Sequence, residues 1–182
     1  MSTTRSIRLG AVLALAALAA FLVWYFAIRD TGGGSSGRGN VVGPEAATVT
    51  TISSLAKKDD RPIYWAGKQP GTTDLELTET ADGNVYVRYL TGGAPIGTPK
   101  PSYLTVGTYP FQDAFHALQV LGKRSSAVTK HLPQGGLAVT NRSSPTSVYL
   151  AYPSRHVQVE VYEPNAKRAL SLVTSGAVQP VR

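Results

Sequence analysis

The chain begins with an uninterrupted apolar run, which constrains its architecture more than any other feature. Residues 9–28 contain no charged side chain, Arg5 and Arg8 precede them, and Arg29 follows. At about 1.5 Å of rise per residue, a helix of this length spans about 30 Å, the thickness of the hydrocarbon core of a bilayer. Such a helix also satisfies its own backbone hydrogen bonds in lipid. We therefore expect Leu9–Ile28 to form a transmembrane helix.

The charges on either side of the run predict its orientation. The first flank, residues 1–8, contains Arg5 and Arg8, whereas Arg29 on the other side is followed directly by Asp30. The more positive flank of a membrane span stays in the cytoplasm. We expect residues 1–8 to be a cytoplasmic tail and the C-terminal part of the chain to lie outside the cytoplasmic membrane.

A cleavable secretory signal is the alternative interpretation of the same run. Ala17, Leu18 and Ala19 fit the small-x-small pattern of a signal peptidase site. Cleavage there would leave a mature chain beginning AFLVWYFAI, an apolar end with nothing to cover it, so an uncleaved anchor is favoured. Both alternatives export the rest of the chain. The absence of cysteine excludes a lipoprotein anchor and a disulfide framework.

A Gly-rich segment separates the run from the rest. Thr31–Gly43 reads TGGGSSGRGNVVG and has almost nothing to bury, so we expect residues 29–47 to be a flexible linker. Residues 48–182 are enough for one extracytoplasmic domain with one core. The formal net charge is +7, but the basic residues are scattered, which argues against nucleic-acid binding and leaves a mild preference for anionic surfaces.

Alternating apolar residues predict a β-hairpin inside the domain. Residues 74–80 and 85–90 alternate, and the Asp82-Gly83 pair between them favours a tight turn. The alternation turns Leu75, Leu77, Val85, Val87 and Tyr89 toward the core and turns Glu76, Thr78, Tyr86 and Arg88 outward.

The remaining pattern predicts an α+β domain. We expect a loop at 92–101, a short helix at 50–58, and further strands at 62–66, 103–109, 127–132, 136–140, 147–152 and 157–162. Helices at 111–123 and 165–174 each begin behind a proline, Pro110 or Pro164. The order strand, tyrosine, proline, helix thus occurs twice, either by duplication or through a shared way of starting a helix. The expected fold is a mainly antiparallel sheet with these two helices on one face.

The sequence contains no compact catalytic or metal-binding motif. His116, His131 and His156 have no Glu or Cys at metal-ligand spacing, and no G-x-S-x-G element accompanies the serines. We expect no metal and no cofactor. The alternative to a non-catalytic protein is a small envelope hydrolase whose polar residues converge only in the fold, with His131 or His156 as the first base to test.

Aromatic residues near the predicted strands are the best indication of a function. Because alternation turns some of them outward, an aromatic surface for a peptide, glycan or lipid is expected, and Tyr86, Arg88 and Tyr149 are the candidate binding residues. The leading hypothesis is a membrane-anchored binding or scaffolding module of the cell envelope. Its expected partners are an envelope protein, a wall polymer or anionic headgroups.

Four segments give the chain a family resemblance. They are IYWAG at 63–67, NVYVRYL at 84–90, YLTVGTYP at 103–110 and SVYLAYP at 147–153, and they follow an Ala-rich anchor and a Gly-rich linker. Over most of residues 60–182 the chain resembles uncharacterised single-span membrane proteins of high-GC Gram-positive bacteria. The resemblance implies a small β-rich exported domain and brings no activity with it.

Overall fold

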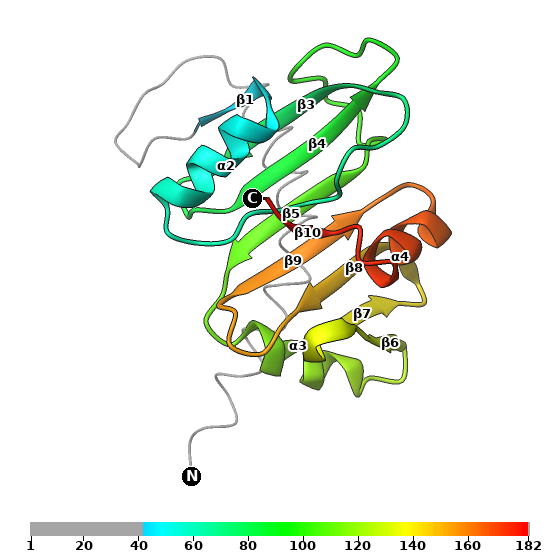
Figure 1. Ribbon diagram of the computed structural model, residues 1–182. Coiled ribbons are helices and arrows are strands. Elements are labelled where there is room, and N and C mark those ends of the chain that lie inside the picture. Colours follow the sequence, from blue (N-terminus) through cyan, green and yellow to red (C-terminus); the bar gives the residue numbers. More distant parts are fainter. Residues whose placement is uncertain (1–41, 182) are drawn as a thin grey trace.

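The computed structural model describes residues 42–181 of the chain (Figure 1). The expected cytoplasmic tail, the transmembrane helix at Leu9–Ile28 and most of the linker lie outside the described residues. Between residues 42 and 181, no helix is both long enough and apolar enough to cross a membrane.

An eight-stranded antiparallel sheet organises the described residues, in the order β1-β3-β4-β5-β9-β8-β7-β6. Its strands are β1 (Val42–Ala47), β3 (Thr72–Glu79), β4 (Val85–Thr91), β5 (Thr105–Pro110), β6 (Ala127–His131), β7 (Leu137–Asn141), β8 (Ser144–Ala151) and β9 (Val157–Tyr162). The short strands β2 (Tyr64–Trp65) and β10 (Gln179–Pro180) pair with each other. The described helices are α2 (Val49–Lys58), α3 (Ala114–Gly122) and α4 (Ala166–Thr174), with a 3-10 turn at Pro133–Gly135. The expected α+β class with a mainly antiparallel sheet is confirmed.

The predicted hairpin forms as β3 and β4. Leu77 lies opposite Val87, in the register that the alternation requires. Gly83 adopts a positive φ of 76°, and its N–H donates to the carbonyl oxygen of Thr80 at 2.8 Å, which closes the turn. In contrast, Val42–Ala47 was expected inside the linker and instead forms the edge strand β1. Pro44 within it lacks an N–H and is tolerated because only one side of an edge strand is paired.

Strand β8 shows that α3 and α4 cover opposite faces of the sheet. Val148 and Leu150 belong to the apolar cluster that includes α4, whereas Tyr149 and Ala151 belong to the cluster that includes α3. Successive side chains of a strand point to opposite faces, so the two clusters lie on different sides. The expectation that both proline-led helices cover one face is therefore wrong. We call the two sides the α4 face and the α3 face.

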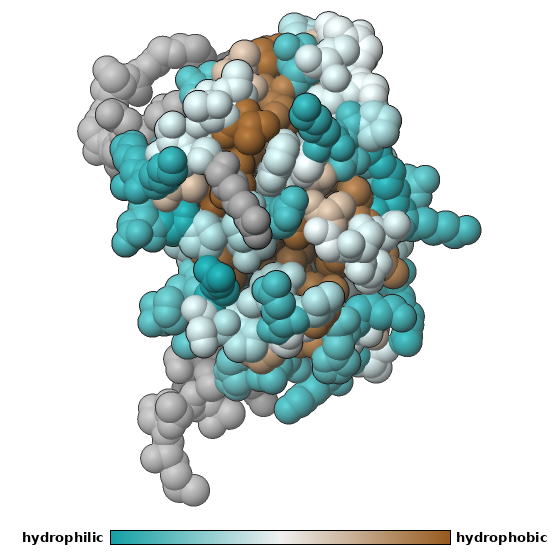
Figure 2. All heavy atoms as spheres, in the orientation of Figure 1, coloured by the Kyte–Doolittle hydropathy of each residue, from teal (hydrophilic) through white to brown (hydrophobic). Residues whose placement is uncertain are grey.

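The α4 face contains the larger apolar core. Ile52 of α2 shares this core with Leu77 and Val87, so α2 packs on the same face as α4. Between α2 and α4, Figure 2 shows apolar side chains surrounded by a hydrophilic surface. The core side chains from β4, β5 and β9 are mostly β-branched, which suits a pleated sheet surface. They are Val85, Val87, Val106, Val157, Val159 and Val161.

The α3 face is polar over β3, β4, β5 and β9, although it is buried. Tyr86 and Arg88 point away from the apolar core, as the alternation predicts, but their exposed fractions are only 2% and 8%. Glu76 on β3 and Glu160 on β9 are also buried on this face. A buried carboxylate needs a partner, so this face must satisfy its charges internally.

Candidate functional site

An open groove lies between the start of α2, the loop after β2 and the start of β3. Its cavity volume is about 400 Å³. We call it the Trp65 groove, and its lining residues are Ala47, Thr48, Val49, Trp65, Gly67, Lys68, Gln69, Thr72, Thr73, Asp74, Leu75 and Tyr89.

The groove exists because β1 is shorter than the strand beside it. Ala47 at the end of β1 pairs with Leu75, so residues 72–74 of β3 have β4 on one side and no β1 residue on the other. After Ala47 the chain turns into α2, with Thr48 as the N-cap. The Thr48 hydroxyl accepts a hydrogen bond from the N–H of Thr51 at 3.1 Å, which fixes the start of the helix at the rim.

The opposite wall is the segment 64–69, which hydrogen bonds hold in place. The N–H of Ala66 donates to the hydroxyl of Tyr89 at 2.6 Å. Gln69 donates its side-chain amide to the carbonyl oxygen of Ala66, and its amide oxygen accepts from Arg168 at 3.0 Å. Burial raises the pKa of Tyr89 well above its ordinary value, so its phenol keeps a proton that it can donate.

The groove combines an aromatic ring with groups that form hydrogen bonds. The indole of Trp65 is half-buried, and the side chains of Lys68 and Asp74 are exposed. The hydroxyl oxygen of Thr72 is buried and has no hydrogen-bond partner. A concave site with an aromatic wall and a few convergent polar groups is the usual chemistry of a ligand pocket.

A second arrangement, on the α3 face, surrounds Glu160. Tyr109 donates its hydroxyl to Glu160 Oε2 at 2.7 Å, and Ser147 and Tyr149 also interact with this carboxyl group. Glu160 Oε1 has no hydrogen-bond partner. Burial raises the pKa of Glu160, and these three hydroxyl groups oppose the rise by stabilising the carboxylate.

The three candidate binding residues from the sequence all lie on this face. Tyr86 packs edge-on against Tyr109, with 5.7 Å between ring centroids, and Tyr149 interacts with Glu160. Arg88 pairs instead with Glu76 and donates to the carbonyl oxygens of Thr98 and Lys100. The structure thus brings Tyr86 and Tyr149 together around Glu160 and gives Arg88 a separate ion pair. None of the three is an exposed side chain.

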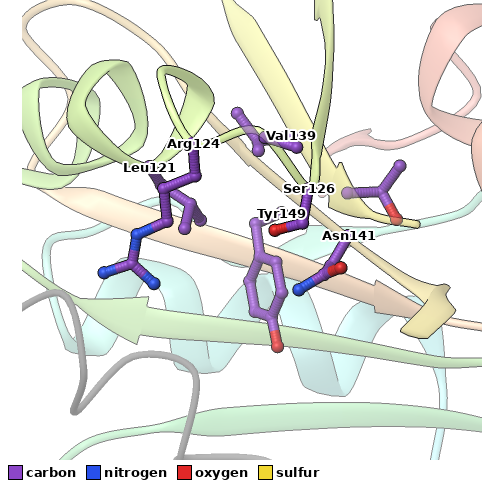
Figure 3. Close-up of a pocket in the computed structure, with 8 residues that line it drawn as sticks. Leu121, Arg124, Ser126, Val139, Asn141 and Tyr149 are labelled. Carbon is purple, nitrogen blue, oxygen red and sulfur yellow. The ribbon is translucent and has the colours of Figure 1, made fainter. Parts of the chain in front are cut away.

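A small recess beside Tyr149 offers no further room. Figure 3 shows Tyr149 between the side chains of Arg124 and Asn141. The cavity volume is about 10 Å³, which is the space of about one water molecule. This recess is therefore too small for an organic ligand.

The histidines are exposed and lie on separate elements. His116 is on α3, His131 ends β6, and His156 precedes β9 with its Nδ1 3.1 Å from the carbonyl oxygen of Gln112. None of them lines the Trp65 groove. Within residues 42–181, no group of three or more histidine or acidic side chains is placed to hold a metal ion.

The sequence interpretation missed the groove. It assigned Trp65 to a strand, Tyr89 to the core and Asp74 to the start of a hairpin, and these assignments are each reasonable locally. The available signal was the segment YWAGKQPGTTD at 64–74, in which an aromatic pair is followed directly by a polar Gly- and Pro-containing loop. Loops of this kind that lie beside a rigid strand often line binding sites.

No family model, curated protein or solved structure matches the chain. The groove and the Glu160 cluster are therefore interpreted from their own chemistry.

Proposed function

We propose that the chain is a membrane-anchored binding module of the cell envelope, whose exported domain takes up its ligand in the Trp65 groove. The observation that carries this proposal is the content of the groove. A half-buried indole, the exposed side chains of Lys68 and Asp74, and Thr72, whose buried hydroxyl has no hydrogen-bond partner, all line one groove of about 400 Å³. An aromatic wall supplies contact area, and the polar groups supply orientation.

The N-terminal sequence supports the location. The apolar run Leu9–Ile28, the arginines before it and the Gly-rich segment after it are the pattern of a signal anchor with a short tether. Residues 29–41, which lie between the proposed anchor and β1, have a root-mean-square span of about 20 Å as a flexible tether. The domain therefore stays near the outer membrane surface, within reach of an envelope protein, a wall polymer or the headgroups.

The alternative function, a small envelope hydrolase, requires a general base beside bound substrate. The two histidines that the sequence offers for this role, His131 and His156, lie outside the groove lining. Replacing either with Ala, in a full-length chain shown to be folded, tests this alternative. If either variant failed to restore a growth or envelope defect that the parent chain restores in cells lacking it, the hydrolase would be favoured over the binding module.

Crosslinking in intact cells tests the proposal. Full-length chain and a Trp65→Ala variant would be crosslinked and purified with whatever they capture. Trp65→Ala should lose most of the captured partner, because it removes the aromatic wall of the groove. Lys68→Ala is the milder test, and Lys123→Ala is its matched control, since both lysines are exposed and only Lys68 lines the groove. Equal capture by the parent and Trp65→Ala would refute the groove as the binding site.

A further inference from the structure

The two edges of the large sheet differ in how they are protected. Figure 1 shows β1 and β6 at opposite ends of the sheet. Edge β1 contains Pro44, and its register shifts between Val42 and Glu45. Both features discourage another strand from pairing there. Edge β6 pairs with β7 in an unbroken register from Ala127 to His131 and contains no proline. The β1 edge is therefore blunted by its backbone, whereas the β6 edge has a regular backbone and is protected only by its short length and by Lys130.

The hydrogen-bond pattern identifies the backbone groups of β6 that point away from the sheet. Leu132 donates to the carbonyl oxygen of Gly136 at 2.8 Å, and Arg142 donates to that of Ser126 at 2.9 Å. Hydrogen-bonded pairs alternate along an antiparallel ladder, so Val128 and Lys130 turn their backbone groups toward β7. Thr129 and His131 turn theirs outward.

These outward groups are accessible. Thr129, Lys130 and His131 are exposed, and no hydrogen bond among the described residues uses the N–H of Thr129 or His131. The N–H of Ala127, at the start of the strand, is already donated to the carbonyl oxygen of Arg124 at 2.9 Å. A row of free donors and acceptors on a regular edge is a template for another strand.

We propose that the β6 edge pairs with the β6 edge of a second copy of the chain, antiparallel and about a two-fold axis at Thr129. In this pairing the two Thr129 residues exchange two hydrogen bonds. Each His131 N–H also donates to the carbonyl oxygen of Ala127 in the other copy, for about four hydrogen bonds in total. The two sheets become one continuous sheet.

Charge and side-chain chemistry select this register. With the axis at Thr129, Lys130 lies opposite Val128 of the second copy. Thr129, whose hydroxyl donates to the carbonyl oxygen of Gly122 at 3.4 Å, lies opposite Thr129 of the second copy. Moving the two-fold axis to Lys130 would place Lys130 directly opposite Lys130 of the second copy, and like charges in that position repel. Moving the axis to Val128 would leave His131 outside the paired region.

Pairing at the β6 edge leaves the Trp65 groove free. The Trp65 groove lies beside β1 and β3, at the far end of the sheet from β6. The dimer leaves both grooves open, and two linked grooves bind a repeating partner more tightly than one. The β6 proposal itself rests on the edge geometry and holds whether or not the groove binds a ligand.

Disulfide trapping tests the pairing and its register. The chain has no cysteine, so introduced cysteines are the only thiols. Full-length Val128→Cys and Lys130→Cys variants with different tags would be co-expressed and oxidised in membranes. In the proposed register they form a non-hydrogen-bonded pair, with Cα atoms about 4.5 Å apart, which a disulfide can bridge. We call the disulfide between Val128→Cys of one copy and Lys130→Cys of the other the mixed crosslink. Its yield should be at least tenfold higher than the yield of crosslinked dimer from the exposed control Lys167→Cys.

The outcomes separate the alternatives. A mixed crosslink no stronger than the Lys167→Cys control overturns the pairing. Stronger self-crosslinking of Lys130→Cys than of the mixed pair overturns the register. A disulfide to a different protein would show that β6 accepts a foreign strand, and it would also overturn self-pairing.

Charged side chains introduced at residue 129 give a second test of the axis. Thr129→Glu, added to both cysteine variants, places two carboxylates opposite each other and should reduce the mixed crosslink at least fivefold. Adding Thr129→Glu to one copy and Thr129→Lys to the other should restore it, because opposite charges then face each other. Failure of this rescue, with both variants melting like the parent, overturns the axis at Thr129.

Discussion

Gly107 and Glu160 lie directly opposite each other in the β5–β9 pair, and the missing side chain of Gly107 is what lets Tyr109 reach Glu160. A Cβ atom at Gly107 would lie 2.8 Å from the hydroxyl oxygen of Tyr109 and 3.0 Å from its ring. The tyrosine ring therefore lies across the glycine. Its hydroxyl thereby provides a hydrogen bond to a carboxyl group that is buried in the centre of the sheet.

Gly107→Ala should therefore destabilise the domain by about 1–3 kcal/mol, because the added methyl group displaces Tyr109 from Glu160. Urea unfolding of the purified chain measures this cost. The control is the same substitution in a Tyr109→Ala background, where the space above residue 107 is open. A cost that is equal in both backgrounds would contradict the proposed role of the glycine.

The raised pKa of Glu160 predicts a pH dependence. Since the folded state holds this proton more tightly than the unfolded state, the contribution of Glu160 to stability is fully present below the unfolded pKa, which is about 4.3 for Glu. This contribution is lost as pH rises through the folded pKa. Glu160→Gln removes this titration, so its stability relative to the parent should improve between pH 4 and pH 7. Urea midpoints that shift in parallel for both proteins across this range would contradict the prediction.

The Glu76–Arg88 pair fastens the loop between β4 and β5 to the sheet. Glu76 accepts from Arg88 and from the backbone N–H of Gly97, and Arg88 donates to the carbonyl oxygens of Thr98 and Lys100. The Arg88 guanidinium also lies 5.5 Å from the ring centroid of Tyr103. This cross-strand pair therefore holds the middle of the loop, at Gly97, Thr98 and Lys100, against the sheet.

Removing only one member of this pair should be costly. Arg88→Met leaves the Glu76 carboxylate buried without its cation and should cost about 3–5 kcal/mol. Combining Arg88→Met with Glu76→Gln should recover much of this loss, because no uncompensated charge remains. Thermal unfolding gives the stabilities, and limited proteolysis at residues 92–101 reports release of the loop. If the double variant lost as much stability as Arg88→Met and Glu76→Gln lose separately when added together, the pairing would be contradicted.

Local patterns predicted the elements of this fold better than its arrangement. The hairpin around Gly83 and the helix behind Pro164 are confirmed because each depends on residues close in sequence. The helix expected at 111–123 also forms, but it begins at Ala114 and not directly behind Pro110, which belongs to β5. The prediction that α3 and α4 cover the same face of the sheet was wrong, although the two segments that precede these helices look alike. Tyr109 directly precedes its proline, whereas Glu163 separates Tyr162 from Pro164. The connections also differ after the proline, since residues 111–113 precede α3 and only Asn165 precedes α4. The likeness of the two segments therefore does not extend to the residues that lead each helix to its face.

The candidate site was harder to predict because its residues come from distant parts of the chain. Arg88 was expected outward and exposed, and the loop that buries it depends on contacts with Thr98 and Lys100. Glu160 receives its hydrogen bond from Tyr109, which is 51 residues away in the sequence. The Trp65 groove depends on where β1 stops relative to β3. A pattern of alternation specifies the face of a strand but not what covers that face.

The two faces of the sheet can be tested separately, with one buried position for each. Val159 belongs to the α4-face core and Leu118 to the α3-face cluster, and each side chain is 1% exposed. Val159→Asp and Leu118→Asp should each cost several kcal/mol, because an unpaired carboxylate would be buried. Gln119→Asp is the matched control, since this neighbour of Leu118 on α3 is exposed and should unfold within about 0.5 kcal/mol of the parent. Circular dichroism melts of the four proteins provide the comparison.

If Leu118→Asp melts like Gln119→Asp, α3 does not pack against β7 and β8. If Val159→Asp melts like the parent, the α4-face core is wrongly placed.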